Sequence, residues 1–225
     1  MKIKAKYFMY IGYCLFVLSY VFIETELNSI SRMSYILRAL KYVGVFICIF
    51  SCSYCSRIDK GKLTYSLFLL TLALANMIFV NGGSGLIEIL IVVFCITVMK
   101  ANVRDIFKCE IVTLLVGHVF VMFLSLIGVL NNNVTSRWFG NYMGSFFAGE
   151  YIRHQMGFLA SNQVPLSLMI IYLMVIVYRK NRVKLYEHIL FLVANFFCFT
   201  YFGSRVSFIL IIVTFIWYEY VFLSK

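Results

Sequence analysis

Residues 131–163 read NNNVTSRWFGNYMGSFFAGEYIRHQMGFLASNQ and separate two apolar runs of the chain. This stretch carries the charged or titratable side chains of Arg137, Glu150, Arg153 and His154. Aromatic residues accompany them, namely Trp138, Phe139, Tyr142, Phe146 and Phe147. A connection of this length without obvious secondary structure is usually functional or disordered, and its aromatic content argues against disorder. We therefore predict a functional loop, for which the rest of the chain serves as scaffold.

The composition of the chain is that of a membrane protein. Of its 225 residues, 63% are hydrophobic and only 13% are charged, and the mean hydropathy is +0.93. Soluble domains are about half apolar and about one quarter charged. The composition therefore predicts an all-α polytopic membrane protein. In such a protein, the excess of basic residues behind the net charge of +11 bears on topology, because lysines and arginines concentrate on the cytoplasmic side of the bilayer. Nucleic acid is not an expected partner.

Hydropathy predicts about eight membrane-spanning helices in a single membrane domain over residues 1–225. The predicted spans are residues 7–23, 35–55, 63–80, 86–99, 111–130, 164–178, 188–202 and 206–223, with the long loop at 131–163. Lysines precede the first apolar run, and no small-residue cleavage site follows it. This pattern favours an uncleaved first helix that starts in the cytoplasm over a removed signal peptide.

The distribution of basic residues predicts the topology. With eight spans and a cytoplasmic N-terminus, fourteen lysines and arginines fall inside and six outside. The inside group is Lys2, Lys4, Lys6, Arg57, Lys60, Lys62, Lys100, Arg104, Lys108, Arg179, Lys180, Arg182, Lys184 and Lys225, and the outside group is Arg32, Arg38, Lys41, Arg137, Arg153 and Arg205. This bias obeys the positive-inside rule. Both termini are therefore predicted to be cytoplasmic and the loop 131–163 extracytoplasmic.

Two short motifs give only weak indications of function. Cys52 and Cys55 have a CxxC spacing, but no second pair and no nearby histidine supports a metal or redox site. All seven cysteines lie in or beside apolar runs, so packing without disulfides is favoured. Residues 81–85, NGGSG, lack a preceding strand and a following GK[ST], so they indicate a turn and not a phosphate cradle. No cofactor and no metal are predicted.

Several ionisable residues occur within predicted spans. Glu88 is costly in a membrane segment unless it is paired or wet, and a partner among the outer arginines is expected. His118 is either a buried relay or a packing histidine bonded to a neighbour, and the packing reading is favoured. His188, beside Glu187, is interpreted as interfacial and structural. Lys41 is expected to extend its ammonium towards the interface.

Three arginines are predicted on the outer face: Arg137, Arg153 and Arg205. A guanidinium offers a planar fork of donors that suits phosphate oxygens. The cluster therefore fits a pyrophosphate ligand. The alternative is that Arg205 only reaches the interface from a helix end, while Arg137 and Arg153 are solvated loop charges.

Glu150 and His154 are four residues apart and would share a face on a helical turn, with Arg153 beside them. Such a set can remove a proton from an attacking hydroxyl while an arginine holds a departing phosphate. The alternative is that Glu150 pairs with Arg153 or His154 and only orders the loop.

The string 153–162, RHQMGFLASN, is followed by an apolar helix, a basic linker, another apolar helix and Gly203-Ser204-Arg205. This order resembles the bacterial O-antigen and capsular polysaccharide polymerases and the related O-antigen ligases. In that family an outer loop carries an arginine, then Gly-Phe and a His-Pro-Asn or similar ending before a helix, with a Ser-Arg turn two helices later. The resemblance covers roughly residues 153–206. Here Ala160-Ser161-Asn162 replaces the common His-Pro-Asn, and His154 does not occupy the place of the missing histidine.

The resemblance implies a membrane glycosyltransferase in the bacterial cytoplasmic membrane. Its substrate would be an undecaprenyl-diphosphate-linked oligosaccharide, and membrane lipid and other polysaccharide-assembly proteins would be partners. The product would be capsule, O-antigen or exopolysaccharide. By motif, Arg153, Gly157, Asn162 and Arg205 carry over, with Arg153 and Arg205 as diphosphate contacts. Gly157 and Gly203 are expected to have structural roles, whereas Arg137, Glu150 and His154 are local inferences.

Members of this family usually have longer chains with a second large outer loop. The chain is therefore expected to be a naturally truncated member, one part of a split polymerase or a degenerate form, and its activity is left open. One alternative is an exporter of lipid-linked sugar or polysaccharide, but the middles of the predicted spans are almost free of charge. Another is a non-catalytic membrane partner of a full-length polymerase.

Overall fold

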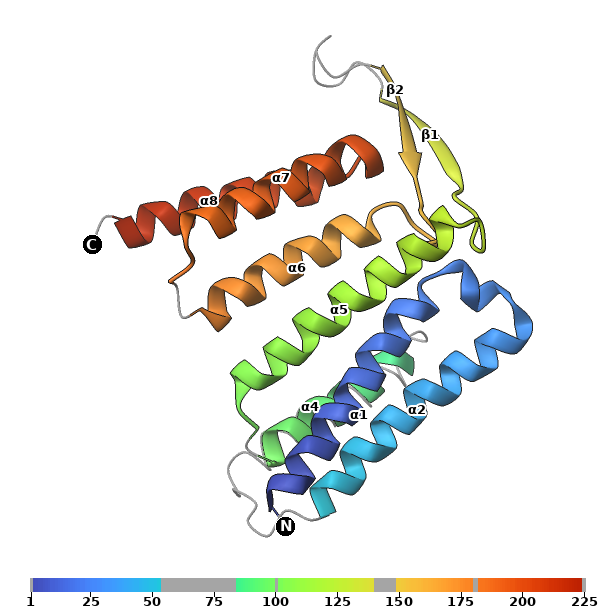
Figure 1. Ribbon diagram of the computed structural model, residues 1–225, viewed down its shortest axis with the longest axis vertical. Helices are drawn as coiled ribbons and strands as arrows, with labels where there is room; N and C mark the ends of the chain where they lie inside the picture. Colours follow the sequence, from blue (N-terminus) through green and yellow to red (C-terminus); the bar gives the residue numbers. More distant parts are fainter. Residues whose placement is uncertain (1, 54–83, 100, 140–148, 180–181, 224–225) are drawn as a thin grey trace. The chain divides into compact units, whose positions relative to one another are not determined.

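The computed structural model describes residues 2–53, 84–99, 101–139, 149–179 and 182–223 (Figure 1). In this part the chain forms helices and one two-stranded hairpin. The elements are α1 (Lys2–Ile23), the short 3-10 helix η1 (Glu26–Ser29), α2 (Ser31–Ser53), α4 (Ser84–Val98), α5 (Val103–Leu126), β1 (Val134–Phe139), β2 (Gly149–His154), α6 (Gln163–Tyr178), α7 (Leu185–Phe202) and α8 (Arg205–Leu223). The predicted span at 63–80 lies outside the described residues.

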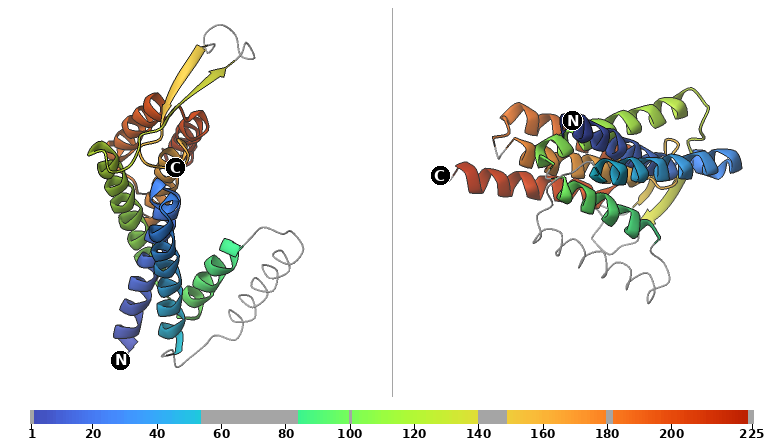
Figure 2. Two further views of the ribbon diagram at one scale, coloured as in Figure 1. Left: turned by 90° about the vertical axis from the view of Figure 1, so that its right-hand side faces the viewer. Right: turned by 90° about the horizontal axis from the view of Figure 1, so that it is seen from below.

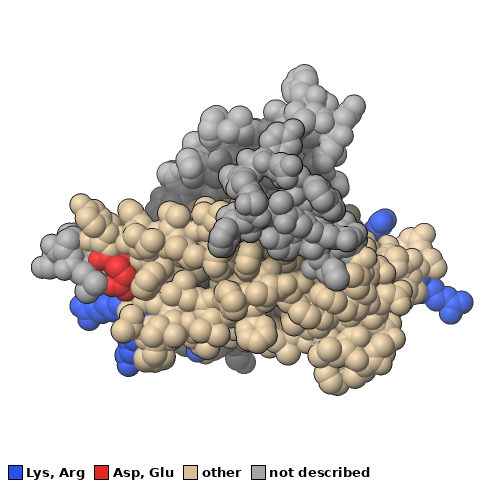
Figure 3. Space-filling model, turned by 90° about the horizontal axis from the view of Figure 1, so that it is seen from above, with Lys and Arg blue, Asp and Glu red and all other residues tan. Residues whose placement is uncertain are grey.

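Four described helices are long and apolar enough to cross a membrane, over Ala5–Ile23, Ser31–Cys52, Val103–Leu126 and Leu185–Phe202. At most 33% of each of these windows is buried inside the chain. On the face drawn in Figure 3, most of the described surface is neither basic nor acidic. Large apolar side chains are exposed on these helices, for example Phe46, Leu126 and Phe197, as is typical of helices that face lipid. The predicted helical class and membrane character are confirmed to this extent, and the count of eight spans stays a prediction.

Helix α5 shows that one predicted linker is helical. The basic segment before residue 111 was expected to connect two spans, but α5 already begins at Val103. Asn102 explains this start, because its side-chain Oδ1 accepts a hydrogen bond from the Arg104 backbone N over 3.2 Å. Asp105 adds a carboxylate to the first turn, where it complements the helix dipole.

The expectation of irregular structure throughout 131–163 is wrong, because β1 and β2 pair as an antiparallel hairpin within it. Val134 pairs with His154 at one end of the ladder and Phe139 with Gly149 at the other. The strands are rich in β-branched and aromatic residues, which favour this pleated conformation. The hairpin extends beyond the ends of α6 and α7 (Figures 1 and 2). Of the loop's aromatic residues, Tyr142, Phe146 and Phe147 lie outside the described residues.

The internal contacts divide the chain into two compact units. Unit 1 comprises Met1–Tyr20 and Ser34–Thr113, and unit 2 comprises Val21–Met33 and Leu114–Lys225. In unit 1 the backbones of α1 and α2 meet at Gly12 and Gly44. A Cβ added to Gly12 would lie 2.9 Å from the Gly44 carbonyl oxygen, and one added to Gly44 would lie 2.8 Å from that of Gly12. Only residues without a side chain permit this approach.

The partner of Glu88 is Lys41, so the expected arginine partner is wrong. The Lys41 Nζ lies 2.7 Å from Glu88 Oε1, and the two side chains are only 12% and 9% exposed. Lys41 also lies over the ring of Tyr42, with 4.9 Å from Nζ to the ring centre. The ion pair therefore fixes α2 against α4 inside unit 1, and Lys41 does not extend freely towards an interface as predicted.

In unit 2, α6, α7 and α8 pack against one another around a core that includes Tyr172, Ile176 and Ile211. His188 is 1% exposed in this core, which corrects its expected interfacial position. The Tyr172 hydroxyl and His188 Nδ1 are hydrogen bonded over 2.7 Å. Glu219 Oε1 lies 3.9 Å from the other ring nitrogen.

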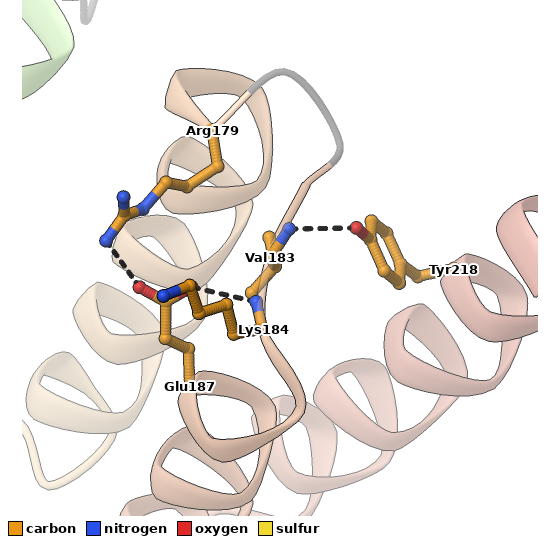
Figure 4. Close-up of polar contacts among 5 residues, drawn as sticks. All are labelled: Arg179, Val183, Lys184, Glu187 and Tyr218. Atoms are coloured by element: carbon orange, nitrogen blue, oxygen red, sulfur yellow. Dashed lines mark hydrogen bonds and ion pairs between the residues drawn. The ribbon is translucent and has the colours of Figure 1, made fainter.

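Polar contacts join the C-terminal ends of α6 and α8 to the N-terminal end of α7 (Figure 4). Arg179 at the end of α6 pairs with Glu187 over 2.6 Å. Glu187 also accepts a hydrogen bond from the Lys184 backbone N over 2.9 Å, which starts α7 before the predicted residue 188. The Tyr218 hydroxyl accepts a hydrogen bond from the Val183 backbone N over 3.0 Å.

Candidate functional site

The candidate site lies in unit 2, where the end of β2 packs on the C-terminal end of α7. Gly203 terminates α7 with φ +64°, and its backbone N donates to the Phe199 carbonyl over 3.0 Å. A left-handed residue at this position is a common helix end, and glycine adopts it without strain. A Cβ at position 203 would lie 3.0 Å from both Cγ and Nε of Arg153. The half-buried side chain of Arg153 therefore rests directly on this glycine.

This contact brings together two segments that the sequence separates widely. Arg205 begins α8 directly after the Gly203-Ser204 turn, although its side chain lies outside the described residues. Val164, in the first turn of α6, packs near Phe202 in a cluster with Met156 and Cys198. The end of β2, the start of α6 and the turn before α8 therefore meet in one place.

His154 is held on the same end of α7. Its ring stacks on Tyr201, with centres 4.2 Å apart and planes 20° apart. The side-chain amide Nδ2 of Asn132 lies 3.2 Å from His154 Nδ1. The amide orientation follows from a second contact, because Asn132 Oδ1 accepts from the Met156 backbone N over 3.0 Å.

That orientation determines what His154 can do. Since Asn132 Nδ2 is a donor, Nδ1 of the imidazole accepts, and the neutral ring carries its proton on Nε2. In this arrangement His154 can donate a hydrogen bond, for example to an anionic oxygen. It has no unoccupied lone pair with which to take a proton from a hydroxyl. The geometry thus favours a donor role over the predicted role as base.

A left-handed turn connects this segment to the next helix. Met156 has φ +48° and Gly157 has φ +80°. A left-handed residue with a side chain costs roughly 1–2 kcal/mol, so Met156 requires compensation. Two features compensate for it. The Met156 backbone N donates a hydrogen bond to Asn132 Oδ1, and the Met156 side chain is buried against Phe202, with 6% of its surface exposed. At Gly157 an added Cβ would lie 2.9 Å from Leu130 Cδ1, which explains the need for glycine there.

The acidic segment between α1 and α2 holds the candidate site in place. The Glu26 backbone N donates to the Gly157 carbonyl over 3.0 Å. Its carboxylate accepts from the Asn131 backbone N over 2.8 Å and from the side-chain amide of Asn133. The Glu24 carboxylate accepts from the side chain of Gln163. This segment therefore ties down both ends of 131–163.

His118 adds an aromatic support beneath the turn. Its Nδ1 is hydrogen bonded to the Leu114 carbonyl over 2.8 Å within α5. Its ring stacks on Phe158, with centres 5.1 Å apart, and Phe158 is only 1% exposed. These contacts are those of a packing histidine, the favoured one of the two predicted roles.

The remaining predicted site residues are placed by their backbones only. Arg137 pairs with Tyr151, and Glu150 pairs with Trp138, in the ladder of the hairpin. The helical turn expected over 150–154 is wrong, since these residues belong to β2. The side chains of Arg137 and Glu150 lie outside the described residues. Asn162 is exposed and directly precedes α6, and its side chain makes no capping hydrogen bond to that helix.

Sequence reasoning missed Asn132, Tyr201 and Glu26 as parts of this site. The run of three asparagines at 131–133 and the acidic turn at 24–26 were visible signals. Their relevance depends on long-range pairing, which no local pattern reveals. Comparison with models of known protein families, with curated proteins and with solved structures finds no match to this chain.

Proposed function

We propose that this protein is a polysaccharide polymerase of the membrane glycosyltransferase type. It joins undecaprenyl-diphosphate-linked oligosaccharide repeats at the outer face of the bacterial cytoplasmic membrane. The observation that carries the proposal is the packing of Arg153 on Gly203, which brings a strand-borne arginine to the turn that precedes Arg205. Two arginines on separate elements that meet at this turn would suit the two phosphates of a lipid diphosphate, because each guanidinium offers a planar fork of donors.

The proposed reaction is a glycosyl transfer. A sugar hydroxyl of one lipid-linked repeat attacks the anomeric carbon of the growing chain. The bond from that carbon to the diphosphate oxygen breaks, and its electron pair leaves with undecaprenyl diphosphate. Arg153 and Arg205 stabilise the charge that develops on the diphosphate. His154 donates from Nε2 to the same anion, as its contact with Asn132 allows. Glu150 is assigned the role of the base, and Arg137 and Asn162 contact the substrate.

The proposal includes a topology. The chain crosses the membrane eight times with both termini in the cytoplasm, and residues 131–163 face outwards. The bias of fourteen inside against six outside basic residues supports this arrangement.

The test measures polymer length in a bacterial strain whose own polymerase is deleted. Wild type is expected to restore long chains. Arg153→Ala and Arg205→Ala are each expected to lower chain extension roughly a hundredfold or more, because one charge-assisted donor lowers the activation barrier by about 3–4 kcal/mol. Lysine at either position should rescue poorly, since it retains the charge but loses the planar fork. Normal extension by both alanine variants would exclude the proposed roles, as would no extension by wild type co-expressed with any downstream fragment.

The chain supplies a matched pair of controls. Gly203 and Gly128 both have left-handed backbones, with φ +64° and +77°. Nothing lies within 4 Å of a Cβ added at Gly128, whereas one at Gly203 meets Arg153. Alanine therefore imposes the same backbone strain at both sites but displaces the guanidinium only at Gly203. Gly203→Ala should reduce chain extension far more than Gly128→Ala at equal protein levels.

A further inference from the structure

Unit 1 contains a groove that the proposed function does not use. Its volume is about 730 Å³, and it lies between the N-terminal parts of α1 and α5. Two hydrogen bonds align these helices. The Tyr10 hydroxyl donates to Asp105 over 3.3 Å, and the Tyr13 hydroxyl donates to Glu110 over 2.8 Å. Residue numbers rise together along both helices, so the two run in the same direction beside the groove.

The lining changes character along that direction. Lys6, Asp105 and Lys108 belong to the first two turns of the two helices. The lining further along each helix is mainly apolar, with Ile11, Leu15 and Val112 as examples. Ile11 is 52% exposed and Val112 51%. The groove thus has a charged end and an apolar end that is open at the side.

The charged end favours an anion. Lys6 and Lys108 are both exposed, and the ion pairs among the described residues involve neither of them. The carboxylate of Asp105 accepts the Tyr10 hydroxyl, and it leaves the lining with one excess positive charge. Lysine ammonium groups bind phosphate as point charges. An occupant with one phosphate and a long apolar tail would complement both ends of the groove.

We propose that this groove binds an anionic phospholipid. Its phosphate is bound by Lys6 and Lys108, and one acyl chain lies along Ile11, Leu15 and Val112. Basic pockets between membrane helices hold anionic lipid headgroups in this way. The site is independent of Arg153 and of the glycosyl transfer, so the two proposals fail separately.

The test uses the full-length protein in nanodiscs with trace phosphatidylglycerol that carries a photoreactive group in its acyl chain. After irradiation, peptides are mapped by mass spectrometry. Crosslinks are expected in residues 7–15 and 109–113. Lys6→Gln/Lys108→Gln should weaken this labelling about twenty-five-fold at low salt, because each lysine near an anionic lipid contributes roughly fivefold. Val112→Trp should also reduce labelling, since it fills the apolar end and leaves both lysines in place.

Three comparisons can overturn the proposal. Arg104→Gln/Arg182→Gln removes the same charge from exposed residues outside the groove lining and should leave labelling within twofold. Photoreactive phosphatidylcholine should label these peptides weakly, and excess glycerol phosphate should not compete. Equal labelling by phosphatidylcholine would mean general contact with bilayer lipid. Full competition by glycerol phosphate would mean a site for soluble phosphate. Unchanged labelling of Lys6→Gln/Lys108→Gln would exclude the two lysines as the anion site.

Discussion

At the scale of single residues, the ion pair between Lys41 and Glu88 has the clearest energetic consequence. Both side chains are almost fully buried, and the pair lies within unit 1 between α2 and α4. Removing one partner leaves the other charge without compensation in a medium of low dielectric. Such a change typically costs 3–5 kcal/mol, whereas replacing both partners with apolar groups is often neutral.

We therefore expect Lys41→Met and Glu88→Gln each to lower the free energy of unfolding by about 3–5 kcal/mol. The double variant Lys41→Met/Glu88→Met should recover most of that loss. The measurement is unfolding of the purified protein by SDS in mixed micelles. Arg38→Met serves as control, because Arg38 lies one turn earlier on α2 and is exposed. A double variant less stable than either single one would show that the loss in the single variants does not come from an uncompensated buried charge.

The same pair shows where sequence reasoning failed at this scale. The sequence indicated that Glu88 needs a partner, because an isolated carboxylate in a membrane helix is costly. It did not identify Lys41, since which helices become neighbours is not encoded in local hydropathy. Arg153 is the opposite case, because a shared diphosphate ligand for Arg153 and Arg205 would require the two segments to approach, and Arg153 does lie against the turn before Arg205. Asn132, which orients His154, belongs to neither case and was not predicted.

At the scale of elements, the packing of α6, α7 and α8 depends on a buried polar contact. The Tyr172 hydroxyl is hydrogen bonded to His188 Nδ1 over 2.7 Å, and both side chains are 1% exposed. Aromatic rings surround this contact, with the centre of the Tyr218 ring 4.7 Å from that of His188. A buried group that loses its partner retains its full desolvation penalty.

Tyr172→Phe should therefore destabilise this three-helix packing by about 1–3 kcal/mol. Amide hydrogen exchange would detect the change as faster exchange in α6 and α7, with little change in α2. Tyr220→Phe is the matched control, because it removes a hydroxyl from a residue of α8 that is 76% exposed. Equal effects of the two substitutions would show that the hydrogen bond is not what holds these helices.

Helix positions were largely predictable, since long apolar runs have few alternatives in a membrane. The first residue of each helix was harder to predict. α5 begins at Val103 because Asn102 caps it, and α7 begins at Leu185 because Glu187 bonds to the Lys184 backbone. In both cases charged residues that were assigned to linkers belong to a first turn. The hairpin was missed because its β-forming residues were interpreted only as an aromatic loop.

At the scale of the whole molecule, the topology is the decisive prediction. Reporter fusions are expected to place Gly149 outside and Asn181 in the cytoplasm, because basic linkers concentrate on the inner side. Alkaline phosphatase should be active only when fused at the first position, and a fluorescent protein should be bright only at the second. If both positions give the same reporter pattern, the predicted order of spans is wrong.

The contact between Gly12 and Gly44 also has a consequence for biogenesis. Both residues belong to the first two helices, and the contact joins their backbones directly. Helices in a bilayer associate through such close packing after each has been inserted. The Gly12–Gly44 contact itself uses no residue from later parts of the chain, although the core around it is completed by Val92 and Cys95 of α4. This contact can therefore form during synthesis, before α4 has been translated, and the α1–α2 pair is then the surface on which α4 packs.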